Sequence, residues 1–248
     1  MRSPSGSRRV GLARRLSKLG YCSRSQAEAL IRAGRVSLNG AVQRDPEQPT
    51  AERDRITVDG QAIGAAQRRY LLLNKPRGLT TSTADERGRD TVYACLLPEQ
   101  AWPAPASADQ ALPWLAPVGR LDRASEGLLL FSNDPEWAAS ITDGDIRKVY
   151  HVRIEQPADA ALLEQLRVGV VDQGERLRCI DAALLRANAE GRSRWLALTL
   201  DEGRNRHIRR LLLAHGLTVQ RLLRVRVGRL ELGDLPKGQW RWIDPGEV

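Results

Sequence analysis

The chain has 248 residues, enough for one full domain and a second small one. A net charge of +9 and a pI near 10.2 indicate a basic surface, and 42% hydrophobic residues exclude a disordered chain. This balance favours nucleic acid as the partner. No apolar run approaches the length of a membrane span, and the N-terminal stretch lacks an apolar signal core, so we expect no membrane partner.

The cysteines and histidines argue against a disulfide scaffold and against a metal centre. Cys22, Cys95 and Cys179 are odd in number, widely spaced and without a C-x-x-C pair. They are typical of free thiols in a reducing compartment, so we expect a cytoplasmic protein. The three histidines show no ligand spacing, and we therefore expect no metal.

A small module is predicted over residues 10–63. Leucines at helical spacing in "GLARRLSKLG" predict a first helix, and Ser23 with Gln26 forms a capping box for a second. The N-G pair in "SLNGAV" and the D-G pair in "TVDGQA" predict two hairpins. We expect residues 1–9 to be a disordered basic tail and residues 64–69 to be a linker.

Basic side chains crowd the two helices predicted for this module. Nearly all of their charges share one sign, which favours a phosphate-binding face over a merely solvated one. The residues expected to bind nucleic acid here are Arg14, Arg15, Lys18, Arg24, Arg32 and Arg35.

Residues 70–248 alternate short apolar strands with loops and predict a larger domain. Strands are expected at "YLLLN", "GLLLFS", "VYHVRI" and "RWLALTL", and helical periodicity appears at 159–166. The clearest helix is "NRHIRRLLLAHG", with Asn205 as its cap and Gly216 as its stop. The Pro- and Ala-rich stretch 98–117 predicts an irregular surface loop. Together these elements predict an α+β fold with a mixed, mainly antiparallel sheet.

The segment "VGRLDRASEGLLLFSND" places one acid between two arginines, just before an apolar run. In an extended segment side chains alternate, which would put Arg120 and Asp122 on one side and Leu121 on the other. A neighbouring arginine favours the ionised carboxylate. Taken alone, an R-x-D pair is far more often a structural clamp than a catalytic element, so its function depends on what surrounds it.

Two other segments carry chemistry of their own. "RKVYHVRI" places Lys148 and Tyr150 on one strand face, where a tyrosine is by default a packed aromatic. "EGRNRHIRRLLLAHG" predicts a helix with an apolar stripe that includes Ile208 and a basic cluster at its start. That cluster is either an exposed basic surface or a receptor for a phosphate or a carboxylate. Its members are Arg206, Arg209 and Arg210.

These pieces, in this order, resemble the RsuA-like branch of bacterial pseudouridine synthases. The matching motifs are "LLLNKPRGLTTST", "GRLDRASEGLLLFSND", "KVYHVRI" and the stretch from "EGRNRHIRR" to "KGQWR", which together span residues 70–243 in family order. The front module resembles the alpha-L RNA-binding domain of this branch. The resemblance implies a pseudouridine synthase fold over 70–248 that needs no cofactor. It also implies ribosomal RNA as the partner, and we expect a monomer; whether the substrate is free RNA or a pre-ribosomal subunit stays open.

The resemblance also assigns roles to residues. Asp122 matches the family's catalytic aspartate, Tyr150 the tyrosine that packs against the target uracil, and Arg209 the basic residue paired with the aspartate. Ile208 matches an apolar residue of the base pocket, and Arg120 an arginine implicated in extruding or replacing the target base. Arg204, Arg206 and Arg210 are expected to bind RNA beside this pocket.

The implied reaction isomerises a uridine of ribosomal RNA, expected in the large-subunit RNA, to pseudouridine. The glycosidic bond breaks, the uracil turns and a carbon–carbon bond forms. Asp122 would act either as nucleophile at the anomeric carbon or as base in an elimination through a glycal, and both routes need it ionised. The flipped base needs a face to stack on, which Tyr150 offers. Either Arg120 or Arg209 would be the partner of Asp122, and we expect Arg209.

The sequence departs from the family pattern at three positions. His207 stands where the family has glutamine, Ser125 where it has threonine and Pro135 where it often has glycine. None of these changes touches the aspartate, tyrosine and arginine named above. Two other classes of function explain the sequence less well. The intact catalytic set argues against a non-catalytic RNA-binding or ribosome-assembly factor, and a DNA-binding regulator leaves most of the chain unexplained.

Overall fold

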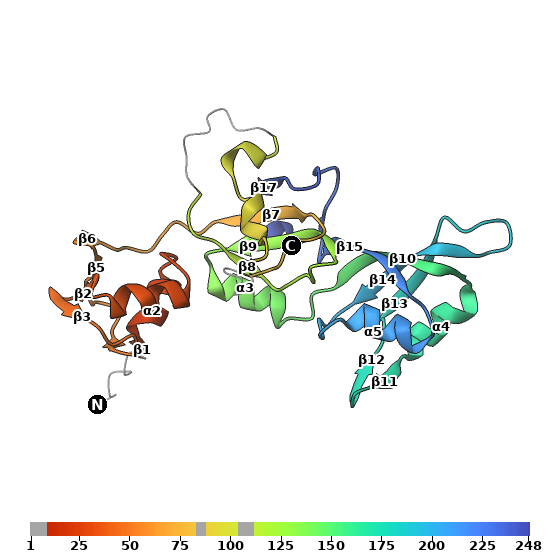
Figure 1. The fold of residues 1–248 in the computed structure, drawn as a ribbon, viewed down its shortest axis with the longest axis horizontal. Coiled ribbons are helices and arrows are strands. Elements are labelled where there is room, and N and C mark those ends of the chain that lie inside the picture. Colours follow the sequence, from red (N-terminus) through yellow and green to blue (C-terminus); the bar gives the residue numbers. More distant parts are fainter. Residues whose placement is uncertain (1–8, 83–87, 104–111) are drawn as a thin grey trace, which may run out of the picture. The chain divides into compact units, whose positions relative to one another are not determined.

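The structure is a computed structural model that describes residues 9–82, 88–103 and 112–248. The described residues form two compact units (Figure 1). The first comprises residues 9–69 with the short segments 112–116 and 132–135, and the second comprises the rest. The predicted tail lies outside the described residues except for Arg9, and so does the middle of the predicted Pro- and Ala-rich loop.

The first unit contains two helices and two small sheets. The helices are α1 (Leu12–Lys18) and α2 (Arg24–Arg32), and the strands are β1 (Val10–Gly11), β2 (Val36–Leu38), β3 (Ala41–Gln43), β4 (Pro49–Thr50), β5 (Ile56–Val58) and β6 (Gln61–Ala62). Strands β3, β2, β5 and β6 form one antiparallel sheet and β1 pairs with β4. The predicted hairpins are confirmed, because Asn39 and Asp59 take the left-handed conformation that each turn requires.

The two helices of this unit are formed by the residues that the pattern indicated. The Ser23 hydroxyl accepts a hydrogen bond from the Gln26 N–H at 3.1 Å, and the Gln26 side chain accepts one from the Ser23 N–H at 2.9 Å. This reciprocal capping box starts α2. Leu12 and Leu16 of α1 pack with Ile31 of α2 in a core that excludes water from all three side chains.

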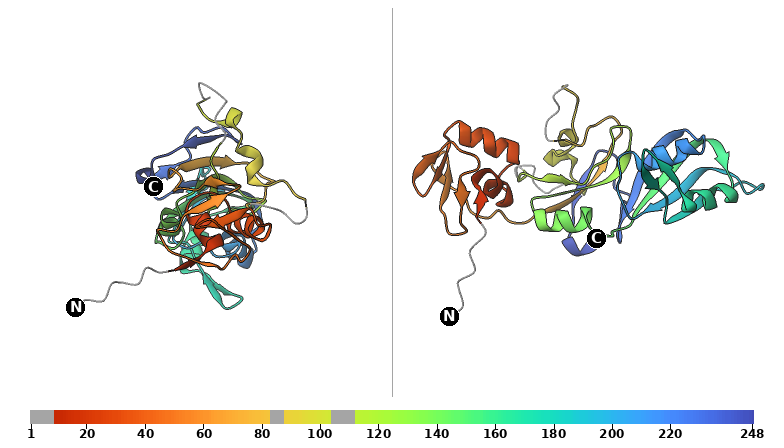
Figure 2. Two further views of the ribbon diagram at one scale, coloured as in Figure 1. Left: turned by 90° about the vertical axis from the view of Figure 1, so that its left-hand side faces the viewer. Right: turned by 90° about the horizontal axis from the view of Figure 1, so that it is seen from below.

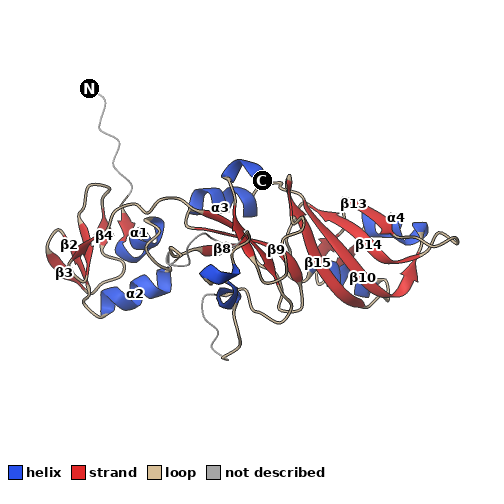
Figure 3. Ribbon diagram, turned by 90° about the horizontal axis from the view of Figure 1, so that it is seen from above, coloured by secondary structure: helices blue, strands red, loops and turns tan. Residues whose placement is uncertain are grey.

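The second unit is built on a mixed sheet of nine strands (Figures 1 and 3). Its main strands lie in the order β13 (Asp181–Leu185), β14 (Ser193–Leu200), β10 (Lys148–Ala158), β15 (Val219–Val227), β9 (Glu126–Ser132), β7 (Tyr70–Lys75) and β17 (Trp240–Trp242), with β16 (Leu230–Glu231) on β15 and β8 (Ala116–Val118) on β9. Strands β15 and β9 run parallel, whereas β13, β14, β10 and β15 are antiparallel neighbours. The predicted α+β fold with a mixed, mainly antiparallel sheet is confirmed.

Helices cover parts of this sheet and bury its apolar side chains. They are α3 (Pro135–Thr142), α4 (Ala160–Val168) and α5 (His207–Ala214), with 3-10 turns η1 (Val92–Cys95), η2 (Pro98–Gln100) and η3 (Pro245–Glu247). Ile208 and Leu211 of α5 pack with Val152 of β10 in one buried cluster. The hairpin of β11 (Val170–Asp172) and β12 (Glu175–Leu177) contacts α5 and projects from the body of the unit (Figure 2).

The start of α5 differs from the sequence prediction. Arg206, not Asn205, is the N-cap residue, and it takes the left-handed conformation with φ of +49° and makes no side-chain capping bond. The helix therefore begins one residue later than a cap at Asn205 would predict. A left-handed arginine carries backbone strain, which here lies beside a large cavity.

Gly127 allows β15 to approach β9 at the point where the two strands pair. Its φ is +99°, and a Cβ built on it would lie 2.3 Å from the carbonyl oxygen of Arg224. Both the conformation and the close backbone approach require glycine.

We predict that Gly127→Ala destabilises the protein by about 2–4 kcal/mol, since backbone strain and a backbone clash add. Gly78→Ala is the matched control: its φ is +103°, yet nothing lies within 4 Å of its Cβ position, so it bears the strain alone, about 1–2 kcal/mol. Urea denaturation measures both. Equal losses in the two variants would contradict the role of the close approach.

Candidate active site

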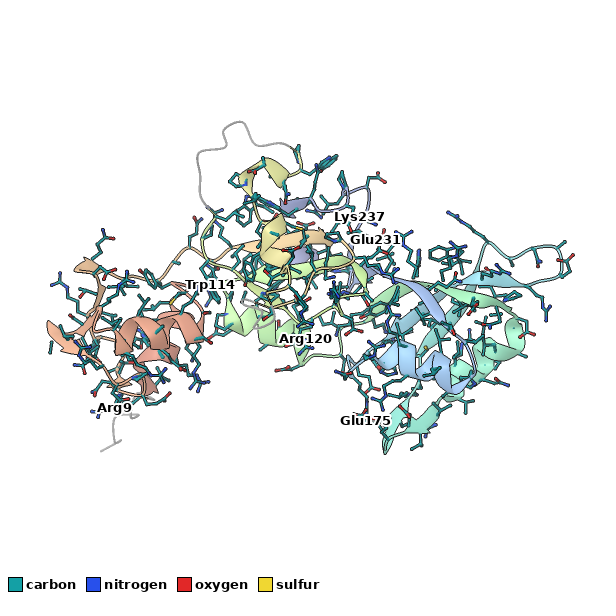
Figure 4. All side chains as sticks on the ribbon, in the orientation of Figure 1. Arg9, Trp114, Arg120, Glu175, Glu231 and Lys237 are labelled. Atoms are coloured by element: carbon teal, nitrogen blue, oxygen red, sulfur yellow. The ribbon has the colours of Figure 1, made fainter. Side chains whose placement is uncertain are left out.

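A cavity of about 410 Å³ opens in the second unit. Its walls come from the loop between β8 and β9, from β10 and β15, and from α5 with the segment before it. All five residues expected at the catalytic centre line it, although they come from three distant parts of the sequence: Arg120, Asp122, Tyr150, Ile208 and Arg209. Figure 4 labels Arg120 on the β8–β9 loop.

Asp122 lies in a turn before β9 and not on a strand. The Ser125 N–H donates to the Asp122 carbonyl oxygen at 2.9 Å, which closes the turn. The expectation that Leu121 points away from the cavity is wrong, because the loop is not extended and Leu121 lines the cavity as well. The Thr81 hydroxyl donates to the Leu121 carbonyl at 2.8 Å and fixes this side of the turn.

A buried lysine that the sequence analysis gave no role holds the Asp122 loop. Lys75, at the end of β7, is 0% exposed. Its Nζ donates to the carbonyl oxygens of Ser125 at 2.8 Å, Pro76 at 3.0 Å and Asp122 at 3.4 Å. Burial lowers the pKa of Lys75 to about 8. The signal was present in "YLLLNK", since a charge that ends a mostly apolar strand needs buried partners.

A second buried charge fixes the far side of the same loop. Glu126 begins β9 and is almost fully buried. Its Oε1 accepts a hydrogen bond from Arg221 Nε at 2.9 Å, and its Oε2 accepts one from Arg221 Nη2 at 3.1 Å. The Nζ of Lys237, which Figure 4 labels, lies 2.7 Å from the same Oε2. Although burial raises the pKa of Glu126, these hydrogen bonds hold it below its usual value. The turn that carries Asp122 is thus anchored at both ends.

Arg209, and not Arg120, is the arginine that lies beside Asp122. Its Nε is 4.0 Å from Asp122 Oδ2, and its Nη2 donates to the Ala124 carbonyl at 3.2 Å. Arg120 is exposed and, among the described residues, forms no ion pair with Asp122. Arg209 therefore places a positive charge next to the carboxylate, and its hydrogen bond to Ala124 also holds the turn that carries Asp122.

The structure separates the arginines expected at the start of α5. Arg206 is exposed and lines the cavity. Arg204 lines it too, but donates to Glu202 at 2.8 Å. Arg210 pairs with Asp172 and Glu175 of the β11–β12 hairpin, and it does not line the cavity. Figure 4 labels Glu175 on this hairpin. The prediction of one continuous basic cluster is wrong, because acids on a distant hairpin draw Arg210 away.

His207, the departure from the family pattern, is buried in the cavity wall. Its Nε2 lies 3.1 Å from the Arg178 amide nitrogen and 3.0 Å from the Arg178 carbonyl oxygen, so it bonds to one of them according to its tautomer. Its Nδ1 lies 3.8 Å from Glu202 Oε1. Burial lowers the pKa of His207, which favours the neutral ring. This side chain joins the start of α5 to the segment between β12 and β13.

The basic residues of the first unit fall into two groups. Arg14 and Lys18 are exposed and, among the described residues, have no carboxylate within ion-pair distance. The others are engaged within the unit: Arg15 donates to the Glu52 carbonyl, Arg24 pairs with Glu28 and Glu47, Arg32 pairs with Glu28, and Arg35 pairs with Asp59. The two unpaired cations are the ones most available to phosphates.

The cysteines are free thiols, as expected. All three are buried, and burial raises the pKa of Cys22 to about 11 and that of Cys179 to about 12. Within the described ranges no group of three metal-ligating side chains occurs. No helix in the described part of the chain combines the length and apolar character that a membrane span requires.

Comparison with known proteins identifies the family. Residues 69–214 match the RNA pseudouridylate synthase family and residues 10–56 match the S4 domain. An RNA pseudouridine synthase of Aquifex aeolicus is 34% identical over 94% of this chain and 90% of that protein. Ribosomal large subunit pseudouridine synthase B of Bacillus subtilis is 31% identical over 94% and 91%. A crystal structure of a pseudouridylate synthase has a TM-score of 0.62 and 25% identity, over 96% of this chain and 97% of that one. The chain belongs to the RNA pseudouridylate synthase family.

The family confirms the predicted resemblance and the predicted enzyme class. Its members isomerise uridine within RNA to pseudouridine. Most of the residues that line the cavity around Asp122 lie within the range that matches the family, whereas Leu222, Arg224 and Val227 follow it. The individual roles of Asp122, Tyr150 and Arg209 stay predictions.

A lysine whose pKa is lower in the folded protein than its ordinary 10.5 makes stability depend on pH. Between pH 8 and 10.5 the unfolded chain binds more protons at this group, so its contribution to stability rises with pH. We predict that Lys75→Met, which has no titratable group at this position, lacks this rise. The difference in unfolding free energy, wild type minus variant, should therefore increase from pH 8 to pH 10.5. Urea denaturation across this range measures it, with the exposed Lys18→Met as control. A difference that does not change with pH would contradict the prediction.

Proposed function

We propose that the protein converts a uridine of large-subunit ribosomal RNA to pseudouridine, with Asp122 as the catalytic carboxylate. Residues 10–63 would bind the RNA, 64–69 would link the two parts and 70–248 would carry out the reaction. The name of the Bacillus subtilis relative supports large-subunit RNA as the substrate. We infer that the enzyme acts as a monomer in the bacterial cytoplasm, where this RNA is made.

One observation carries the proposal. Among the described residues that line the cavity, Asp122 is the one carboxylate, and six cationic side chains accompany it. These are Arg120, Lys148, Arg204, Arg206, Arg209 and Arg224. Positive charge attracts an RNA phosphate backbone. An uncharged sugar substrate would not need such an excess.

The chemistry needs one ionised carboxylate and a face for the base. The N1–C1′ bond of the uridine breaks and its electron pair stays with the uracil. Asp122 either forms a bond to C1′ or removes the proton of C2′ to give a glycal. The uracil then turns and C5 bonds to C1′. In the first route the Asp122–C1′ bond breaks at this point, and in the second C2′ regains the proton that Asp122 had taken. The C5 hydrogen leaves as a proton and N1 takes up a proton. Tyr150, half-buried in the cavity wall, supports the proposal as the face that receives the flipped base.

Asp122→Asn tests the role of the carboxylate. We predict that conversion of ribosomal RNA falls by at least about 10³-fold, because the amide neither attacks C1′ nor accepts the C2′ proton. RNA affinity should be kept. The measurement maps pseudouridine on unmodified transcripts and subunit particles by carbodiimide labelling and primer extension, with the exposed Asp234→Asn as control. Full conversion by Asp122→Asn would refute the assignment, and no conversion by the wild type on any fragment would favour a non-catalytic RNA-binding factor.

Arg14 and Lys18 test the proposed RNA-binding surface of the first unit. We predict that Arg14→Gln with Lys18→Gln weakens RNA binding at low salt and lowers the slope of log affinity against log salt by about 2, one for each lost phosphate contact. Filter binding over a salt series measures the slope. Arg226→Gln with Arg229→Gln removes the same charge from exposed positions of the second unit and should leave the slope unchanged. Equal changes in both double variants would contradict a localised surface.

A further inference from the structure

Two cations lie inside the cavity on either side of Tyr150. Lys148 precedes Tyr150 by two residues on β10, so both side chains face the cavity and both line it. Arg224 of β15 is the direct cross-strand partner of Tyr150 and lines the cavity too. The tyrosine face on which a flipped uracil would stack is thus flanked by an ammonium and a guanidinium.

A bulge in β15 brings Arg224 to this place. Lys148 pairs with Val227 and Val149 with Arg226, so a regular ladder would pair Tyr150 with Val225. The register shifts there, and Tyr150 pairs with Arg224 instead. Since directly paired residues share a face, the bulge turns Arg224 from the far side of the sheet into the cavity. Bulges that re-aim a side chain are common beside active sites.

Among the described residues, neither cation has a carboxylate within 4.0 Å. Arg224 is 6% exposed, and its Nε donates to the Leu128 carbonyl oxygen at 2.7 Å. Burial and then the neighbouring Arg224 lower the pKa of the half-buried Lys148, and the more distant Asp201 and Asp145 offset this only in part. Two neighbouring cations that form no ion pair are costly to the folded protein, so the place is suited to an anion.

The anion that fits is the uracil ring and not a phosphate. The cations at the exposed rim, Arg120 and Arg206, are accessible to the RNA backbone, whereas Arg224 is enclosed in the wall. When the N1–C1′ bond breaks, the uracil keeps both electrons and its negative charge spreads onto O2 and O4. Donors already in place where charge develops lower the barrier of such a step.

We propose that Lys148 and Arg224 form an anion subsite that holds the uracil oxygens while the base is detached from the sugar, an inference that rests on the proposed function. Both groups donate hydrogen bonds and transfer no proton. The electron pair of the N1–C1′ bond goes to N1, and the matching positive charge at C1′ is taken up through Asp122 by either of its two routes. The subsite then holds the base as it turns to present C5.

The experiment compares Lys148→Met, which keeps the length of the side chain, with Lys148→Arg and wild type on two RNAs. One carries uridine at the target and the other 5-fluorouridine, whose electron-withdrawing fluorine stabilises the uracil anion by itself. Single-turnover cleavage of the N-glycosidic bond is read by nuclease digestion and mass spectrometry, and RNA affinity by filter binding. Arg226→Met is the matched control, because Arg226 lies two residues from Arg224 but pairs with Val149, whose side chain does not line the cavity.

Lys148→Met should slow the reaction of the uridine RNA by about 10²-fold, as expected for the loss of one preorganised donor, with unchanged RNA affinity. With 5-fluorouridine the loss should shrink to about 10-fold or less, and Lys148→Arg should restore most of the rate. An equal loss on both RNAs, or a loss of affinity in place of rate, would overturn the subsite. If the wild type itself leaves uridine unchanged, the proposed function fails; an active wild type with an unaffected Lys148→Met variant refutes the subsite alone.

Discussion

The buried ammonium of Lys75 is the interaction on which the site depends. A charge with no exposure to water must find its hydrogen bonds inside the protein, and Lys75 finds them at the carbonyl oxygens of Asp122 and Ser125 and at that of its own neighbour Pro76. The turn cannot relax without leaving that charge unsatisfied. Arg209 and the buried Glu126 hold the same turn from other directions. The position of the carboxylate is therefore set by backbone contacts, which leaves its side chain free to meet a substrate.

The charges that line the cavity around this turn must serve both the binding of RNA and the catalytic carboxylate. Among the described residues, six cationic side chains line the cavity beside a single carboxylate, an excess that repels itself in the free protein and that a polyanionic substrate relieves. The same cations surround the carboxylate that both routes of isomerisation use. The cations differ in place: those at the rim are exposed, whereas Arg224 is fixed in the wall by its bond to Leu128. The exposed cations suit the phosphate backbone of an RNA, and the enclosed Arg224 suits a negatively charged base in the cavity.

Local patterns in the sequence predicted local structure well. The capping box at Ser23 and the two turn dipeptides gave the right helix start and hairpins, because each depends on a few neighbouring residues. The motifs also predicted that Asp122, Tyr150 and Arg209 share one site. Features that depend on contacts between distant residues could not be predicted from local patterns. The partners of Arg210 lie on the β11–β12 hairpin, far from it in the sequence. The bulge that turns Arg224 toward the cavity breaks the alternation of side chains from which the face of a strand is predicted. The sequence showed a charged residue, Lys75, at the end of an apolar strand, but it did not show which three carbonyl oxygens would accept its hydrogen bonds.

We infer that, in this cavity, the carbon–nitrogen bond of a uridine of ribosomal RNA is replaced by a carbon–carbon bond. The direct measurement is release of tritium from ribosomal RNA whose uridines carry tritium at C5, because the new bond at C5 displaces that hydrogen. The account predicts that wild-type protein releases tritium equivalent to a single uridine per RNA molecule, without cutting the RNA. RNA that is bound tightly in the cavity but keeps all of its tritium would contradict it.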